Sequence, residues 1–164
     1  MEPTDTDATA VVCDAGPLIH LDEVGALDLL GDFGAVLIPE SVWREVERHQ
    51  PSAFEHAPPS LCRVPATGSP AHRLQVIART LTLHRGEIDA LRLAEERQVT
   101  MLLCDDAAAR LAARCMGIDV HGTLGVLIRA IRRRQRTREQ VVAILESIPH
   151  RSTLHVRKSL LAEV

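Results

Sequence analysis

The chain has 164 residues, 46% of them hydrophobic and 25% charged, with a net charge of −3. This length and composition are typical of one globular domain with a sizeable core, and the negative net charge gives no global basic signature. Only 2% of the residues are aromatic, so we expect an aliphatic core and no sheet that stacks RNA bases on exposed rings.

The first half of the chain predicts two strand–helix units. Residues 1–8 are an expected loose tail, which lacks the basic and apolar parts of a secretory signal. An apolar strand is predicted over 10–13, a short helix over 18–21, a helical stretch over 24–30, a strand over 35–38 and a helix over 40–49. Residues 50–70 hold five prolines and predict a long irregular region with a strand at 61–64, a kind of loop that is often functional.

The second half alternates in the same way. The pattern predicts helices over 71–81 and 87–97, a strand over 99–104, a helix over 106–116, a strand over 118–120, a helix over 123–134 and a last helix that begins at 137, followed by a short helix or extended tail. Such alternation predicts an α/β fold with a parallel sheet covered on both faces, in one domain over residues 9–164. No apolar run approaches the roughly 20 residues of a membrane span, so we expect a cytoplasmic protein.

Carboxylates recur where these strands end or helices begin. Asp14 follows the first strand, Glu45 lies on the helix after the second, Glu87 opens a later helix, and Asp105 and Asp106 follow the strand at 99–104. Sites in parallel sheets form beyond the carboxyl ends of the strands. Acids gathered there would repel one another without a divalent cation, which predicts a hard-metal site and metal-assisted phosphodiester hydrolysis.

Each acid alone also has an ordinary explanation. Asp14 suits a turn or a helix N-cap, Glu87 is favoured by the helix dipole, and Glu45 suits a solvated helix face. One of Asp105 and Asp106 is expected to cap the next helix, which leaves the other to point into the cleft. The functional interpretation depends on the five acids taken together.

An arginine-rich segment occupies residues 129–138. Two interpretations are equally supported, a solvated helix end and a patch that binds phosphate groups of RNA. Its six arginines are Arg129, Arg132, Arg133, Arg134, Arg136 and Arg138. Nearby, Thr123 is expected to be an N-cap whose hydroxyl lies near the same sheet edge.

Other site types are not favoured by the pattern. The four cysteines form no C-x-x-C pair, so free thiols, buried at Cys13 and Cys104, are expected rather than zinc or disulfides. Residues 122–125 match no phosphate-binding glycine motif. A phospho-receiver domain needs a lysine after a late strand, but the one lysine is Lys158. A dehalogenase-type phosphatase needs Asp-x-Asp after the first strand, which the chain lacks.

The residues in these positions resemble a PIN domain, and more narrowly a bacterial and archaeal PIN subgroup long labelled as a domain of unknown function. The resemblance covers residues 10 to 130. It is carried by Asp14-Ala15-Gly16-Pro17-Leu18-Ile19, Ile38-Pro39 with Val42 and Glu45, Gly86-Glu87 with Ala90-Leu91 and Leu93-Ala94, Leu102-Leu103-Cys104-Asp105-Asp106 with Ala109-Arg110 and Ala112, and Gly122-Thr123-Leu124-Gly125-Val126-Leu127.

This resemblance implies a three-layer α/β/α fold with a short parallel sheet. It also implies an endoribonuclease dependent on Mg²⁺ or Mn²⁺, often the toxin of a toxin–antitoxin pair. RNA is then the substrate, and a small antitoxin protein and a second copy of the chain are candidate partners. The alternative is a PIN-like module that binds RNA or protein without cutting.

The resemblance also assigns roles to the acids. Asp14, Glu87 and either Asp105 or Asp106 would hold the metal, and Glu45 would hold a second metal or orient the attacking water. Related sequences often have Thr-x-Asp at the fourth position, so spacing favours Asp106 and strand position favours Asp105.

Overall fold

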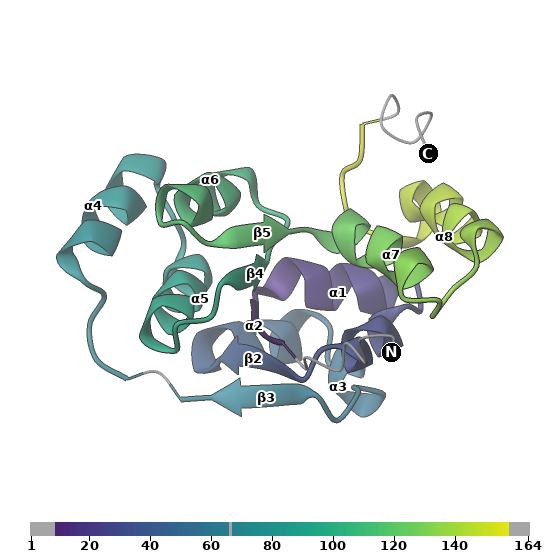
Figure 1. Ribbon diagram of the computed structural model, residues 1–164, viewed down its shortest axis with the longest axis horizontal. Helices are drawn as coiled ribbons and strands as arrows, with labels where there is room; N and C mark the ends of the chain where they lie inside the picture. The colour runs from purple at the N-terminus through teal and green to yellow at the C-terminus, as the bar shows by residue number, and fades with distance from the viewer. Residues whose placement is uncertain (1–8, 66, 158–164) are drawn as a thin grey trace, which may run out of the picture.

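The computed structural model describes residues 9–65 and 67–157, which form a five-stranded sheet flanked by helices (Figure 1). Every strand pair is parallel, and the order is β3-β2-β1-β4-β5. The strands are β1 (Ala10–Cys13), β2 (Ala35–Pro39), β3 (Leu61–Val64), β4 (Met101–Leu103) and β5 (Asp119–His121). The predicted α/β class and three-layer architecture are confirmed. The expected tail at 1–8 lies outside the described residues.

Helices cover both faces of this sheet because the strand side chains alternate in direction. Val11 and Cys13 join one core with α1, η1, α7 and α8, whereas Val12 and Leu102 join a second core with α4, α5 and α6. The helices of the first core and those of the second lie on opposite sides of the sheet in Figure 1. The helices are α1 (Ala15–Glu23), the 3-10 helix η1 (Leu27–Asp32), α2 (Glu40–His49), α3 (Ser52–Glu55), α4 (His72–Leu81), α5 (Arg85–Glu96), α6 (Ala107–Cys115), α7 (Thr123–Arg132) and α8 (Arg138–Arg151).

Some boundaries differ from the sequence-based expectation. α1 begins directly after Asp14 rather than at 18, because Pro17 is tolerated in a first helical turn. The stretch expected to be helical over 24–30 is instead the short 3-10 helix η1, displaced toward the C-terminus. The proline-rich region is more ordered than expected, since it contains α3 as well as the expected strand β3.

The segment after β2 is held by aromatic packing. Trp43 on α2 stacks on Phe54 of α3, with ring centroids 3.9 Å apart. The guanidinium of Arg63 on β3 lies 5.5 Å from the Trp43 ring and also pairs with Glu40. These contacts tie α3 and β3 to α2, the helix that carries Glu45.

Two further expectations concern cysteines and membranes. The four cysteines are free thiols, and Cys13 and Cys104 are buried, as predicted. Within residues 9–65 and 67–157, no helix combines the length and apolar character that crossing a bilayer requires.

Candidate metal centre at the sheet edge

The carboxyl ends of β1 and β4 lie side by side and bring two predicted acids to one edge. The Asp14 N–H donates to the Leu103 carbonyl at 2.9 Å, and the Cys104 N–H donates to His121 at the end of β5 at 2.8 Å. Asp14 directly follows β1, and Asp105 is the second residue after the end of β4. The strand ends therefore place Asp14 and Asp105 as the parallel-sheet argument predicts.

Asp14 is a buried carboxylate among other acids. It is 8% exposed, and it holds the N-cap position of α1 without a capping hydrogen bond from its side chain. Burial raises its pKa to about 6, and the charges of Glu87 and Glu45 add to the effect, while hydrogen bonds from the Ala15 N–H and the Cys104 thiol oppose it. Among the described residues, no basic side chain forms an ion pair with Asp14.

Two other predicted acids approach Asp14 from α2 and α5. Gly86 marks the meeting point, because a Cβ added there would lie 3.2 Å from Glu45 Oε2 and 3.7 Å from Asp14 Oδ1. Glu87, the next residue, is 12% exposed at its side chain and accepts a hydrogen bond from the His84 N–H at 2.7 Å. Glu45 is exposed, and no hydrogen bond or ion pair to it is found in the part of the chain that the structure describes.

Asp105 and Asp106 have different surroundings. Asp106 caps α6, since its Oδ1 accepts from the Ala109 N–H at 2.9 Å. Asp105 turns toward the sheet edge, where Oδ2 lies 2.8 Å from His20 Nδ1. Asp105 also accepts from the Thr123 N–H at 2.7 Å and from the Thr123 hydroxyl at 2.6 Å.

These hydrogen bonds determine the charge of Asp105. Burial opposes ionisation, but the donors on His20 and Thr123 outweigh it and lower the pKa of Asp105 below its ordinary value. The expected N-cap role of Thr123 is wrong, because Gly122 is the N-cap of α7 and the Thr123 hydroxyl binds Asp105 instead.

The buried thiols are unsuited to metal binding. Burial and the nearby charge of Asp14 raise the pKa of both Cys13 and Cys104. A thiol ligates zinc as the thiolate, so these two cysteines stay protonated neighbours of the acids. The donors at the edge are carboxylate oxygens, the ligands that Mg²⁺ and Mn²⁺ prefer.

In this structure the acids are not arranged as a set of metal ligands. Among the described residues, no three His, Cys, Asp or Glu side chains are grouped closely enough to hold an ion. Asp14 and Glu45 lie against Gly86, whereas Glu87 bonds to His84 and Asp105 bonds to His20 and Thr123. The chemistry of the donors fits a hard divalent cation. Burial is the main cause of the raised pKa of Asp14, and a cation would neutralise the charges of Glu87 and Glu45 that add to it.

Half of the arginine-rich segment forms ion pairs within the protein. Arg129 and Arg133 bind Asp32 at 2.7 and 3.0 Å, and Arg136 binds Asp28 at 2.7 Å. Both acids lie on η1. These contacts tie η1 to the end of α7 and the turn that follows it, and they favour a structural role for three of the six arginines.

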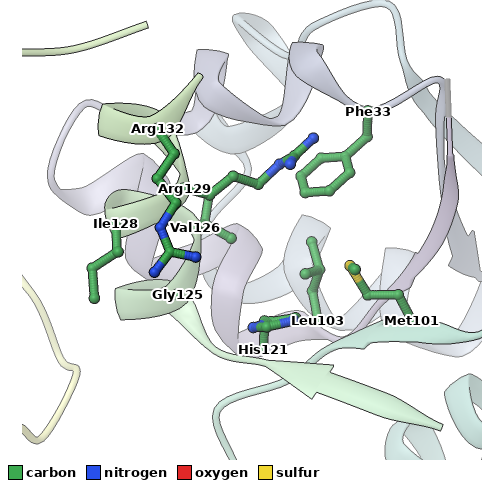
Figure 2. Close-up of a pocket in the computed structure, with 9 residues that line it drawn as sticks. All are labelled: Phe33, Met101, Leu103, His121, Gly125, Val126, Ile128, Arg129 and Arg132. Atoms are coloured by element: carbon green, nitrogen blue, oxygen red, sulfur yellow. The ribbon is translucent and has the colours of Figure 1, made fainter. Parts of the chain in front are cut away.

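A pocket of about 350 Å³ lies between α7 and the β4–β5 part of the sheet (Figure 2). Its wall is mostly apolar and includes Phe33, Met101 and Leu103. Figure 2 shows Arg129 reaching over the Phe33 ring, and its guanidinium lies 4.7 Å from the ring centroid. None of the predicted acids lines this pocket.

The sequence did not predict the contacts that three neighbours of the acids make. His20 bonds to a residue 85 positions away, and local spacing carries no signal for such a pair. Gly86 belongs to one of the motifs that carry the resemblance, but its role as a point of close approach was not predicted, although a glycine in the first turn of a helix often marks such an approach. Arg110, which donates to the Cys104 carbonyl at 3.0 Å, lies one helical turn after the α6 cap.

Comparisons with known proteins agree with the fold. A family model described as a PIN domain matches residues 10–164. Among solved structures, the chain is similar to a PilT N-terminus domain protein from the archaeon Sulfolobus solfataricus P2, with a TM-score of 0.53 and 14% sequence identity over 75% of this chain and 94% of that chain. At that identity the likeness shows the fold alone. No match was found among the curated proteins.

Proposed function

Since this chain belongs to the PIN domain family, we propose that it is a metal-dependent endoribonuclease whose active site is the acidic group at the carboxyl edge of the sheet. One observation carries the proposal. Asp14 is buried, its pKa is raised to about 6, and two further carboxylates increase the shift. A buried acid beside like charges is destabilising on its own, and such arrangements are characteristic of functional sites.

The acids have distinct roles in this proposal. Asp14, Glu87 and Asp105 hold Mg²⁺ or Mn²⁺, which when bound lowers the pKa of a water molecule and neutralises phosphate charge. Asp105 is preferred over Asp106, because it lies against Gly16 in the first turn of α1, close to Asp14, whereas Asp106 caps α6. Glu45 is exposed beside Asp14, so its free carboxylate is placed to orient the attacking water or to hold a second ion.

Residues that contact the acids hold their carboxylates in position. His20 and Thr123 keep Asp105 ionised and oriented. The Cys104 thiol lies 3.5 Å from Asp14 Oδ2 and donates to it. Gly86 leaves space for the Glu45 carboxylate to approach the first turn of α5.

The decisive experiment is incubation of the protein with mixed single-stranded RNAs in Mn²⁺, Mg²⁺ or EDTA. We expect cleavage with either metal and none in EDTA. Asp14→Asn and Asp105→Asn should abolish cleavage, whereas Asp106→Asn should retain it at slightly lower stability. The control is Asp119→Asn, which removes an exposed acid on β5. Cleavage that persists in excess EDTA contradicts the metal mechanism, and folded protein without cleavage in any metal favours the non-cutting module.

We further propose that the nuclease acts in the cytoplasm as the toxin of a toxin–antitoxin pair. The support is the family resemblance together with an open acidic site, which is hazardous to a host unless restrained. Expression of the wild-type chain alone should slow bacterial growth, and Asp14→Asn at equal expression should relieve the effect. Equal growth of the two strains contradicts the toxin role and leaves the nuclease assay unaffected.

A small antitoxin would be the partner in that role. We propose that it lays an extended segment or a helix across the site and inserts a basic side chain among Asp14, Glu87 and Asp105. That insertion is electrostatically favourable, because the described residues provide Asp14 with no cation of their own. The proline-rich stretch 51–70 is the proposed contact region for this partner.

A further inference from the structure

A groove of about 520 Å³ lies beside Asp105, and its wall includes none of Asp14, Glu45 and Glu87. We call it the Asp105 groove. Besides Asp105, its polar wall consists of Arg110, His121, His155 and Arg157. Asp105 is thus the one acid in a wall with two guanidinium groups and two imidazoles.

One wall of the groove is built by the chain after α8. Residues 152–157, here called the C-terminal strap, leave α8 as an extended thread that passes close to α7 (Figure 1). Glu23 at the end of α1 anchors the strap, because its carboxylate accepts from the Ser152 hydroxyl at 2.6 Å and from the Thr153 N–H at 2.8 Å. The strap therefore has a defined position on the molecule.

The strap separates apolar from basic side chains by alternation. Leu154 and Val156 pack against the core that α1, α7 and α8 share. His155 and Arg157, in the positions between, are exposed. The two-residue period of an extended chain turns these basic residues away from the core, and both line the groove.

The arginines of the groove are free to bind an anion. Arg110 donates to the Cys104 carbonyl at 3.0 Å, and neither Arg110 nor Arg157 forms an ion pair among residues 9–65 and 67–157. Asp105 Oδ1 and Arg110 Nη1 both approach Gly122, but among the described residues Asp105 pairs with His20 and Thr123 and forms no ion pair with either arginine. By contrast, Arg129, Arg133 and Arg136 already pair with acids on η1.

We propose that the Asp105 groove binds the ribose-phosphate backbone of single-stranded RNA, with Arg110 and Arg157 contacting phosphate groups next to the cleavage site. The inference rests on the proposed nuclease function and names the surface that positions its substrate. A guanidinium binds phosphate with paired hydrogen bonds. Asp105 belongs both to the groove wall and to the acidic edge, so a backbone bound in the groove lies next to that edge.

The test measures binding without cleavage. A short fluorescein-labelled uridine RNA is titrated with the full chain carrying Asp14→Asn, in EDTA, and the anisotropy is followed over a series of NaCl concentrations. Adding Arg110→Gln and Arg157→Gln should weaken binding about tenfold or more. It should also lower the slope of log affinity against log salt by about 1.4, since each phosphate contact on a single strand contributes roughly 0.7.

Two double variants with the same loss of charge complete the design. Arg79→Gln with Arg114→Gln removes exposed arginines from α4 and α6, and we expect less than a twofold change. Arg132→Gln with Arg134→Gln removes exposed arginines of the arginine-rich segment, and we expect a smaller effect than in the groove. An equal or larger effect there overturns the assignment of the groove, as does an unchanged salt slope in the groove variant.

Further controls distinguish weaker binding from misfolding of a variant and from failure of the proposed nuclease function. Arg157→Gln alone changes one exposed side chain and should give about half of the reduction in slope, and thermal melts by circular dichroism check that each variant is folded. Metal-dependent cleavage by the wild type is measured apart from binding. If RNA binding depends on the groove but no RNA is cleaved, the groove inference is supported and the proposed nuclease function is contradicted. If RNA is cleaved but binding does not depend on the groove, the nuclease function is supported and the groove inference is contradicted.

Discussion

Thr123 donates two hydrogen bonds to the carboxylate of Asp105, one from its N–H at 2.7 Å and one from its hydroxyl at 2.6 Å. Thr123 is the first residue of α7 and is 1% exposed. The position of Asp105 therefore depends on how α7 is packed as well as on the strand that precedes it.

The first prediction concerns this pair. Thr123→Val keeps the shape and the backbone N–H but removes the hydroxyl, so the pKa of Asp105 should rise. A hydrogen bond to a charged group is worth about 2 kcal/mol. The lowered pKa of Asp105 stabilises the fold fully above the unfolded pKa of about 4, and this stabilisation is lost as the pH falls from that value through the lower pKa of the folded state. The loss in free energy of unfolding should therefore be larger at pH 7 than at pH 3, as measured by urea denaturation.

Thr123→Ser is the matched control, because it retains the hydroxyl. It should keep most of the pH dependence and most of the cleavage activity. If Ser and Val behave alike, the hydroxyl is not what holds Asp105.

The second prediction concerns Asp14 and pH. Because its pKa is raised from 3.8 to about 6 in the folded protein, the unfolded chain releases this proton first as the pH rises. Metal-free protein should lose stability between those values, by at most ~3 kcal/mol. Asp14→Asn removes this loss, so the variant should melt at a higher temperature than the wild type at pH 7 in EDTA and with little difference near pH 4.

Metal provides the complementary measurement. Mn²⁺ should raise the melting temperature of the wild type at pH 7, since a ligand that binds the folded state stabilises it by mass action. It should have little effect on Asp14→Asn. A wild-type melting temperature that is insensitive to Mn²⁺ at millimolar concentration argues against a site at Asp14.

The third prediction concerns Gly86. A methyl group there would lie 3.2 Å from Glu45 Oε2 and 3.3 Å from Val42 Cγ2. Glu45 is exposed and can move, so Gly86→Ala should displace its carboxylate from Asp14 and lower kcat. Stability should change by less than about 1 kcal/mol, because alanine also favours the helix. Gly31→Ala is the control, since its added methyl meets only Pro58 at 3.5 Å, and it should leave cleavage unchanged.

The fourth prediction concerns the ion pairs between η1 and the arginine-rich segment. Asp32 binds both Arg129 and Arg133, and its side chain is 17% exposed. Asp32→Asn should lower the free energy of unfolding by about 1 kcal/mol or more without changing RNA affinity. Asp28→Asn, at a side chain 59% exposed, should cost less than about 0.5 kcal/mol. Tighter RNA binding in Asp32→Asn, through the two arginines it releases, would indicate that the segment itself contacts the substrate.

The sheet and its acidic edge were predictable because both follow from local patterns. Strands that alternate with helices predict a parallel sheet, and such a sheet gathers its strand ends, which places Asp14 and Asp105. The choice between Asp105 and Asp106 was not predictable. Both residues follow β4, and their different surroundings depend on the folded chain, in which Asp106 accepts the capping bond from Ala109 and Asp105 accepts from Thr123.

Long-range partners account for most of what was missed. The arginine-rich segment carried no sign that its counter-charges lie on η1, about a hundred residues earlier. The strap likewise could not be placed from the sequence, because its position depends on Glu23, 129 residues before Ser152. Short patterns define the elements, and contacts between distant elements define the surroundings of the site.

The stack of Trp43 on Phe54 offers an optical probe of one part of the molecule. Trp43 is the single tryptophan of the chain, and it lies on α2, two residues before Glu45. Its emission therefore reports whether α2 and α3 remain packed together, whereas circular dichroism reports the helices of the whole chain. A red shift of the emission that precedes the loss of helical signal during heating would show that the helix carrying Glu45 separates first.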